Sequence, residues 1–254
     1  MALDKITAIL KTCLTDQPLA PATLLYNEGW LLRLTLEWFS THKAPNHPFA
    51  FPTGARWFSE AIVPSAFLHR FRGDRLGESS THLDGAIGHF VIGGTGKADL
   101  ALSPNATHFV AIEAKLFSGL APGVKNAPTY DQAARTVACI AEMLRRANRS
   151  PSEMALGFFV VAPQAVIQQG VFTQQLSRDS IRRTVEKRVG EYKGDQDQWH
   201  ARWFLPTFER MTIGALGWEE IVAVIEKQDA PAANLLKEFY RHCLKFNGSP
   251  GAPG

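Results

Sequence analysis

Three charged side chains interrupt an otherwise apolar stretch of the chain, residues 97–115. Residues 98–102 and 108–114 predict two short strands joined by a turn; Asp99 lies in the first, and Glu113 and Lys115 lie at the end of the second. Side chains alternate between the faces of a strand, so Glu113 and Lys115 share one face, and Asp99 could approach Glu113 from a neighbouring strand. Two carboxylates in an apolar site are costly unless they are compensated, and a divalent cation such as Mg²⁺ prefers oxygen ligands. Lys115 could then orient a water molecule or stabilise developing negative charge.

The spacing of these residues resembles the signature of a known enzyme superfamily. Asp99, followed fourteen positions later by Glu113-Ala114-Lys115, is similar to the motif of the PD-(D/E)xK nucleases, with Ala98 in place of the proline. The resemblance covers residues 24–163. It implies an α/β restriction-endonuclease-like fold, a three-layer core in which helices flank a central mixed sheet of about four to five strands.

The same resemblance implies a function. It predicts hydrolysis of phosphodiester bonds in DNA, with Asp99, Glu113 and Lys115 as catalytic residues. Asp99 and Glu113 would also bind Mg²⁺, for which Mn²⁺ could substitute. The alternative is a nucleic-acid-binding or regulatory module that has the same fold and has lost catalysis. A structural role is also open, in which Glu113 and Lys115 form a surface pair and Asp99 caps a turn.

Members of the superfamily often carry a further glutamate on a helix beside the sheet, where it completes the metal site. The apolar spacing predicts a helix over residues 23–41, which contains Glu28. A second helical stretch is expected over residues 56–68, ending near Pro64, and contains Glu60. We favour Glu28, but both glutamates remain candidates, and either could be an ordinary solvated helix residue.

A first strand is expected over residues 81–92, and Gly93, Gly94 and Gly96 would turn it into the next strand. Asp84 and His89 on this strand could point into the site. We expect them instead on the surface of a hairpin.

The segments that follow the strand pair supply further candidates. Residues 129–149 predict a helix with a buried alanine-rich side, and Thr129 is the expected N-cap. Gln132 and Arg135 lie in its first turns, near the ends of the strands, and are candidate substrate-binding residues. The remaining patterns predict helices over 3–14, 164–189, 218–227 and 232–245, a buried strand over 155–162 and an edge strand over 201–207.

Two basic stretches could contact a phosphate backbone. Residues 69–78 (HRFRGDRLGE) are rich in arginine, and the second half of the predicted helix 164–189 holds the densest positive cluster of the chain. Both stretches fit a second interpretation equally well. Exposed loops are often charged, and mixed charges on a helix pair at i,i+4 spacing.

The composition argues against a disulfide-rich protein, a zinc-binding CxxC protein and a membrane-spanning protein. The chain has 254 residues and a net charge of +3, and its three cysteines lie far apart, so neither a disulfide framework nor a CxxC zinc site is suggested. No segment approaches the roughly 20 apolar residues of a membrane span. We expect one cytoplasmic domain over residues 1–246, a disordered tail over 247–254, DNA as partner and no membrane association; the resemblance also leaves a homodimer open.

Overall fold

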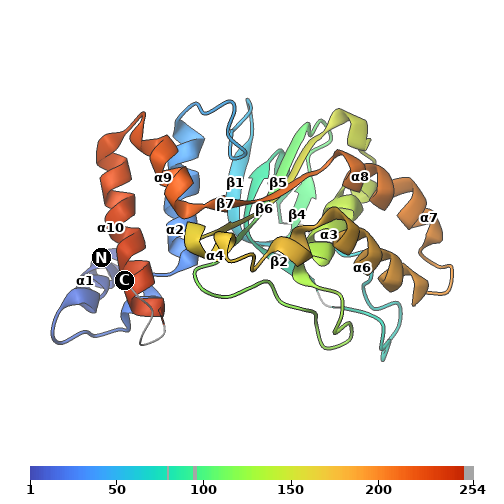
Figure 1. The fold of residues 1–254 in the computed structure, drawn as a ribbon, viewed down its shortest axis with the longest axis horizontal. Coiled ribbons are helices and arrows are strands. Elements are labelled where there is room, and N and C mark those ends of the chain that lie inside the picture. The colour runs from blue at the N-terminus through green and yellow to red at the C-terminus, as the bar shows by residue number, and fades with distance from the viewer. Residues whose placement is uncertain (79, 94–95, 249–254) are drawn as a thin grey trace.

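The architecture is α/β, as expected, and is built on a mixed five-stranded sheet. The computed structural model describes residues 1–78, 80–93 and 96–248. The sheet has the order β1-β2-β5-β6-β7, with bounds Arg56–Val63, Thr81–Gly88, His108–Ala114, Ala155–Ala162 and Thr212–Gly217. β1, β2 and β5 are antiparallel neighbours, whereas β5, β6 and β7 run parallel (Figure 1).

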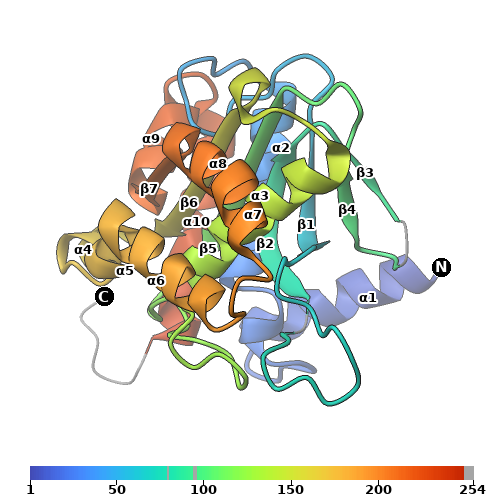
Figure 2. The same ribbon diagram turned by 90° about the vertical axis from the view of Figure 1, so that its right-hand side faces the viewer.

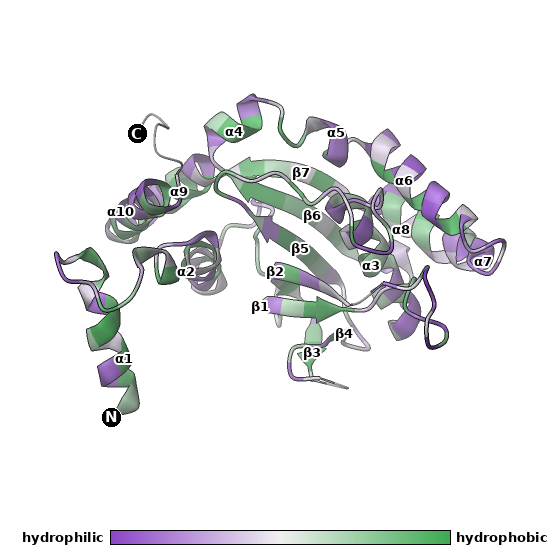
Figure 3. Cartoon of the chain, turned by 90° about the horizontal axis from the view of Figure 1, so that it is seen from below, coloured by the Kyte–Doolittle hydropathy of each residue, from purple (hydrophilic) through white to green (hydrophobic). Residues whose placement is uncertain are grey.

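Helices cover both faces of the sheet (Figures 1, 2 and 3). One apolar core joins the sheet to α3 (Gln132–Ala147), α6 (Arg178–Gly190) and α8 (Leu205–Arg210). The other joins it to α2 (Glu28–Thr41), α9 (Trp218–Glu226) and α10 (Ala230–Asn247). β5 and β6 are buried along most of their length, which explains why their sequences are continuous apolar runs rather than alternating ones.

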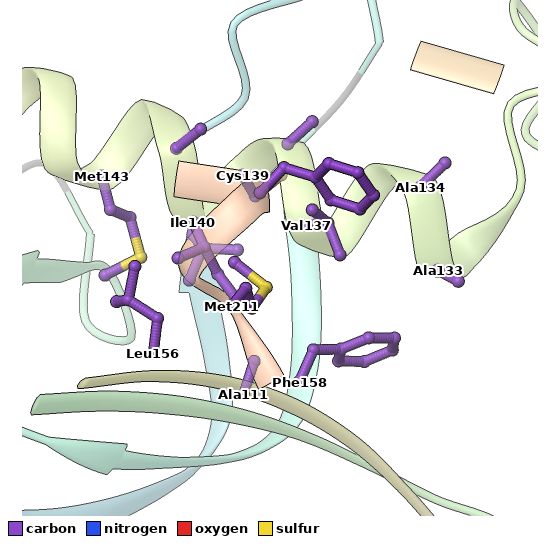
Figure 4. Close-up of a cluster of buried hydrophobic side chains, with 14 of the residues drawn as sticks. Ala111, Ala133, Ala134, Val137, Cys139, Ile140, Met143, Leu156, Phe158 and Met211 are labelled. Atoms are coloured by element: carbon purple, nitrogen blue, oxygen red, sulfur yellow. The ribbon is translucent and has the colours of Figure 1, made fainter. Parts of the chain in front are cut away.

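The long amphipathic helices agree with the sequence prediction, apart from their ends. α2 begins later than expected, after an N-cap formed by Asn27. α3 is capped by the Asp131 side chain, not by Thr129, and its buried face packs on Ala111 and Phe158 of the sheet (Figure 4). Asn148 then ends α3 in a left-handed conformation.

The shorter elements complete the chain. They are α1 (Ala2–Lys11), η1 (Thr12–Leu14), η2 (Ala22–Leu24), η3 (Pro151–Glu153), α4 (Gln164–Gln168), α5 (Thr173–Leu176), α7 (Asp197–Trp199) and the π-helical turn η4 (His200–Phe204). The single helix predicted over 164–189 is therefore divided into α4, α5 and α6.

Two predicted elements are wrong in type. Residues 56–63 form β1 rather than a helix, because Trp57, Phe58 and Ile62 suit a pleated surface and pair in register with β2. Residues 201–207 are helical rather than an edge strand. Pro206 lies just after the π-helical turn η4, where the regular hydrogen-bond pattern of the helix is interrupted, and Phe204 and Phe208 are buried one turn apart.

The predicted pairing of residues 98–102 with 108–114 is also wrong. β4 (Leu100–Leu102) pairs with β3 (Phe90–Ile92) in a separate two-stranded sheet, and the antiparallel partner of β5 is β2. The chain leaves the main sheet at Gly88, whose φ is +155° and where a Cβ would lie 2.4 Å from the carbonyl oxygen of His108. Only glycine allows the two backbones to approach this closely.

Some expectations concern the chain as a whole. Cys13, Cys139 and Cys243 are buried free thiols. Among the described helices, none combines the length and the apolar character needed to cross a membrane. The predicted tail overlaps the end of α10 at Asn247, and its residues 249–254 lie outside the described residues.

Candidate active site

Glu113 and Lys115 lie at the carboxyl end of β5 and contact each other. The Lys115 Nζ atom is 3.4 Å from the Glu113 Oε2 atom, as the alternation of side chains along a strand predicts. The side chain of Glu113 is 1% exposed, and that of Lys115 is 14% exposed. The Lys115 backbone is fixed on two sides, because its N–H donates to Val161 and its carbonyl accepts from the indole of Trp218.

The acidic neighbour of this pair is Asp84, on β2. Gly85 is paired with Ile112, so Asp84 stands beside Glu113 on the adjoining strand. The Asp84 Oδ2 atom accepts a 2.8 Å hydrogen bond from the N–H of Ala114 and lies 3.9 Å from the Lys115 Nζ atom. The Asp84 side chain is 32% exposed, so the group of Asp84, Glu113 and Lys115 can be reached from solvent.

Burial and charge act on the Glu113 carboxyl group. Desolvation first, and then the charge and close approach of Asp84, raise the pKa of Glu113 to about 8; Lys115 and the Gln132 amide act in the opposite direction. The Glu113 Oε1 atom is buried and has no hydrogen-bond partner among the described residues. An unpartnered buried carboxylate oxygen is costly, and it is a free ligand position for a cation.

Gln132, at the start of α3, lies close enough to Glu113 to act on its carboxyl group. Its backbone N–H donates to the Ala121 carbonyl, and its side-chain Oε1 atom accepts from the Ala121 N–H at 3.1 Å. With the oxygen held in this way, the amide nitrogen is directed to Glu113, where it helps to keep the pKa from rising further. Gln132 therefore connects the loop after β5 to the carboxylate.

Arg135, the other predicted substrate-binding residue, is not brought to the carboxylates. Its positive charge acts on Glu78, Tyr130 and Asp131, whose pKa values it lowers in opposition to burial. The Arg135 Nε atom is buried without a hydrogen-bond partner among the described residues. Arg135 faces a buried polar cluster on the α3 side of the sheet.

Asp99 does not lie beside Glu113. It forms a bridge with Ile62 at the outer edge of β1, so β1 and β2 separate it from β5. Three strand spacings amount to roughly 14 Å, too far for two carboxylates to share one ion. Asp99 instead lines a mostly apolar cavity of about 370 Å³ next to Arg146. The predicted pairing of Asp99 with Glu113 is corrected to Asp84 with Glu113.

The two candidate glutamates occupy different positions. Glu60 is on a strand, not a helix: the pairs of Ser59 with Gly85 and of Ala61 with Leu83 place it beside Asp84. Its backbone is left-handed, with a φ of 54°, and its carboxylate is 60% exposed and lies 3.1 Å from the Arg33 guanidinium. A non-glycine residue in this conformation stores strain and is common at functional sites.

Glu28 is the first residue of α2 and is directed towards α10. Burial first, and then the charge of Glu28, raise the pKa of the Cys243 thiol to about 12. No hydrogen bond or ion pair joins Glu28 to Asp84, Glu113 or Lys115 within the described part of the chain. The register therefore places the backbone of Glu60 beside that of Asp84, although the Glu60 carboxylate is paired with Arg33, whereas Glu28 lies at the start of α2.

The sequence offered one signal for Asp84. In the segment THLDGAIG, this aspartate lies between Leu83 and an Ala-Ile pair that is buried in β2. An acid in a buried strand is a candidate site residue, as Glu113 is in β5. The expectation that Asp84 lies on the surface of a hairpin is corrected, because its carboxylate contacts Ala114 and lies near Lys115.

The site has the donors of a hard-cation site, although they are few. Within the described residues, no group of three or more His, Cys, Asp and Glu side chains is arranged to hold a metal ion. Two carboxylates, one with a partnerless oxygen and one open to solvent, fit Mg²⁺, which keeps several water ligands and needs only one or two carboxylates from a protein.

The chain was also compared with known proteins. It matches no protein-family model, no curated protein and no solved structure.

Proposed function

We propose that this protein is a divalent-metal-dependent nuclease that hydrolyses phosphodiester bonds in DNA, with Asp84, Glu113 and Lys115 as catalytic residues. One observation carries the proposal: a buried carboxylate, Glu113, has an oxygen without a partner and faces a second carboxylate and an ammonium group. Structural ion pairs do not need an excess of acid in a dry site. A bound cation would supply the positive charge that these groups lack.

The sheet supports the same proposal. An acid on β2 and an E-x-K sequence at the end of its neighbour β5 are arranged as the PD-(D/E)xK resemblance implies, once Asp84 replaces Asp99. We therefore propose the restriction-endonuclease-like fold as the finer description of the α/β architecture. DNA is proposed as the substrate because of this resemblance.

The residues would share the work as follows. Asp84 and Glu113 would hold Mg²⁺ or Mn²⁺, which when bound supplies a water of lowered pKa and stabilises charge on the phosphate. Lys115 is held by main-chain bonds so that its ammonium group stays beside both carboxylates, where it can orient the attacking water and stabilise the negative charge of the transition state. Gln132 would fix the orientation of the Glu113 carboxylate.

A second candidate function is supported by one observation. The described residues offer only two converging carboxylates, and the third acid nearby, Glu60, is paired with Arg33. This small number of metal-binding side chains favours a module that binds nucleic acid but does not cleave it. The intact Lys115 and the partnerless oxygen of Glu113 favour the enzyme.

The experiment compares variants on plasmid and linear DNA with Mg²⁺, Mn²⁺ or EDTA. We expect cleavage by the wild type in Mg²⁺ or Mn²⁺ only, and a loss of at least about a hundredfold in rate for Asp84→Asn and Lys115→Ala. Asp99→Asn is the matched control and should retain activity. If no metal supports cleavage above the level of Lys115→Ala, the nuclease proposal fails, and retention of DNA on a gel would then support the binding module.

A further inference from the structure

The loop between β1 and β2 has an exposed tip that the nuclease proposal does not use. We call residues 69–75 the basic loop: they hold three arginines and one aspartate. Phe71 in the middle of this loop is 62% exposed. Arg72 and Arg75 are exposed, and neither forms an ion pair with any described residue.

The two ends of the basic loop are anchored in the interior. The guanidinium of Arg188, which is 1% exposed, donates to the Leu76 carbonyl, and the Tyr192 hydroxyl donates to Leu76 and Phe67. Ser65 donates to Glu78 across the base of the loop. Burying charged groups such as Arg188 and Glu78 costs free energy, and packing of the core does not require it. The network therefore fixes the shape of the loop.

The tip is fixed as well. Arg70 bonds to Asp74 within the loop at 2.9 Å and to Asp195 on the neighbouring turn at 2.8 Å, and it lies over the ring of Tyr192. These contacts hold Arg70 under the loop. Phe71, Arg72 and Arg75 are exposed and are not held by ion pairs with other described residues.

The basic loop lies at the same end of the sheet as the candidate active site. Val63 is paired with Thr81, so the loop leaves the sheet at the end where the carboxyl end of β5, with Glu113, also lies. The loop that follows Lys115 contacts both regions. Its Asn126 side chain donates to Gly77 at 2.8 Å, and its Ala121 backbone holds Gln132, which acts on Glu113. Both loops lie at the bottom of the molecule in Figure 1.

We infer that the basic loop binds an unpaired stretch of nucleic acid next to the scissile phosphate, with a base stacked on Phe71 and phosphates at Arg72 and Arg75. This inference rests on the proposed function. An exposed ring between arginines suits an unstacked base, because each base offers a π-face to an aromatic side chain. The bases of an intact duplex are already stacked on one another and are not available to Phe71.

The test measures binding of a labelled single-stranded oligonucleotide and its duplex by fluorescence anisotropy, in EDTA so that nothing is cut. We expect the wild type to bind the single strand more tightly. Phe71→Ala should weaken single-strand binding by about tenfold or more, and Phe71→Leu should do nearly the same because stacking needs the ring. Duplex binding should change little in both variants.

The charge contribution has its own control. Arg72→Gln should reduce the slope of log affinity against log salt by about 0.7, because one phosphate contact is lost. Lys227→Gln removes one exposed charge from the end of α9, in the helical layer on the other face of the sheet, and should leave the slope unchanged. Since all these side chains are exposed, the variants should melt at the wild-type temperature.

The outcomes separate this inference from the nuclease proposal. If single-strand binding is unchanged in Phe71→Ala, or equal in Phe71→Leu and wild type, the inference is overturned even when the wild type cleaves DNA. If Phe71→Ala loses single-strand binding while no metal supports cleavage, the loop assignment stands and the nuclease proposal fails. Binding of duplex in preference to single strand by the wild type would also overturn the inference.

Discussion

At the scale of single residues, the site is defined by the Glu113 carboxylate, one oxygen of which has no hydrogen-bond partner among the described residues. Glu113 is buried beside Asp84, and only Lys115 and Gln132 favour its charged form. A protein that worked only as a scaffold would gain stability from an apolar residue at this position. A cation that supplies positive charge would offset the free-energy cost of burying Glu113 beside Asp84.

This cost gives a first prediction. With a folded-state pKa raised to about 8 from 4.5, Glu113 keeps a proton that the unfolded chain has lost, so its contribution to the free energy of unfolding falls as the pH rises from about 4.5 to 8. In EDTA, the melting temperature of Glu113→Gln relative to wild type should therefore increase between pH 5 and pH 8. Mg²⁺ should raise the melting temperature of the wild type at pH 8 and leave the variant unchanged.

Thermal melts at both pH values, with and without Mg²⁺, check the prediction. Asp99→Asn is the control, because it removes a carboxylate that is remote from Glu113. The prediction is contradicted if Glu113→Gln and wild type differ by the same amount at pH 5 and pH 8.

Residue types were easier to predict from the sequence than their partners. Glu113 and Lys115 were found because one strand fixes their relation, whatever the rest of the fold. The acid opposite Glu113 depends on which strand is its neighbour, and β2 is that neighbour although β4 is nearer in sequence. Gln132 was found because helices after a strand begin near the strand end.

At the scale of elements, the departure of the chain from the main sheet decides which acid meets Glu113. Gly88 ends β2 with its backbone close to that of His108, and the β3–β4 hairpin that follows removes Asp99 from the sheet centre. A regular strand at this position would have continued the pairing with β5.

The second prediction tests this close approach. Gly88→Ala should lower the free energy of unfolding by about 2 kcal/mol or more, because its φ of +155° is strained for alanine and the Cβ would meet the His108 carbonyl at 2.4 Å. Gly190→Ala is the matched control in the last turn of α6, where a Cβ meets nothing within 4 Å. It should be neutral, or stabilising by up to about 1 kcal/mol.

Urea denaturation of both variants measures the difference. Equal stability of Gly88→Ala and wild type would contradict the proposed reason for the departure of the chain.

Sequence patterns predicted elements where one period dominated. β5, β6, α2 and α3 have long apolar patterns, and each was found. The pattern was ambiguous over residues 56–63, where aromatic and β-branched residues fit a half-buried strand as well as one face of a helix. Pairing with β2 resolves the ambiguity, and pairing is not visible in a local window.

At the scale of the whole molecule, the sheet divides the interior into two cores, and burial makes two histidines resist protonation. Burial lowers the pKa of His47, which stacks on Phe39, to about 4. Burial, and then the charge of His89, lower the pKa of His108 to about 4. Both histidines are therefore neutral in the folded protein at neutral pH.

The third prediction follows from these histidines. Between about pH 6.5 and pH 4 the unfolded chain takes up protons that the folded chain does not, so the free energy of unfolding should fall as the pH is lowered through this range. His108→Gln should flatten this acid limb, whereas His82→Gln, at an exposed position of β2, should not. Melting temperature against pH in EDTA measures the limb, and identical limbs for the wild type and His108→Gln would contradict the assignment.

The basic cluster of α6 shows how a whole-molecule arrangement overrides a local pattern. Arg178 and Arg182 pair with Glu209 on α8, and Arg178 also bonds to main-chain carbonyls of that region, while Arg188 is buried under the basic loop. The cluster mainly joins elements within the protein. The sequence could not distinguish this from a phosphate groove, because the partners come from segments far along the chain.

The hydrogen bond from Asn126 to Gly77 joins the loop that follows Lys115 to the loop that presents Phe71. A strand of nucleic acid that settles on the second loop would restrain the first. Occupancy and reactivity would then be thermodynamically linked, so that a long polymer reacts faster than a dinucleotide even when both saturate the protein. The hydrogen bond between Asn126 and Gly77, which itself contacts no substrate, would thus contribute to selectivity for polymers over short fragments.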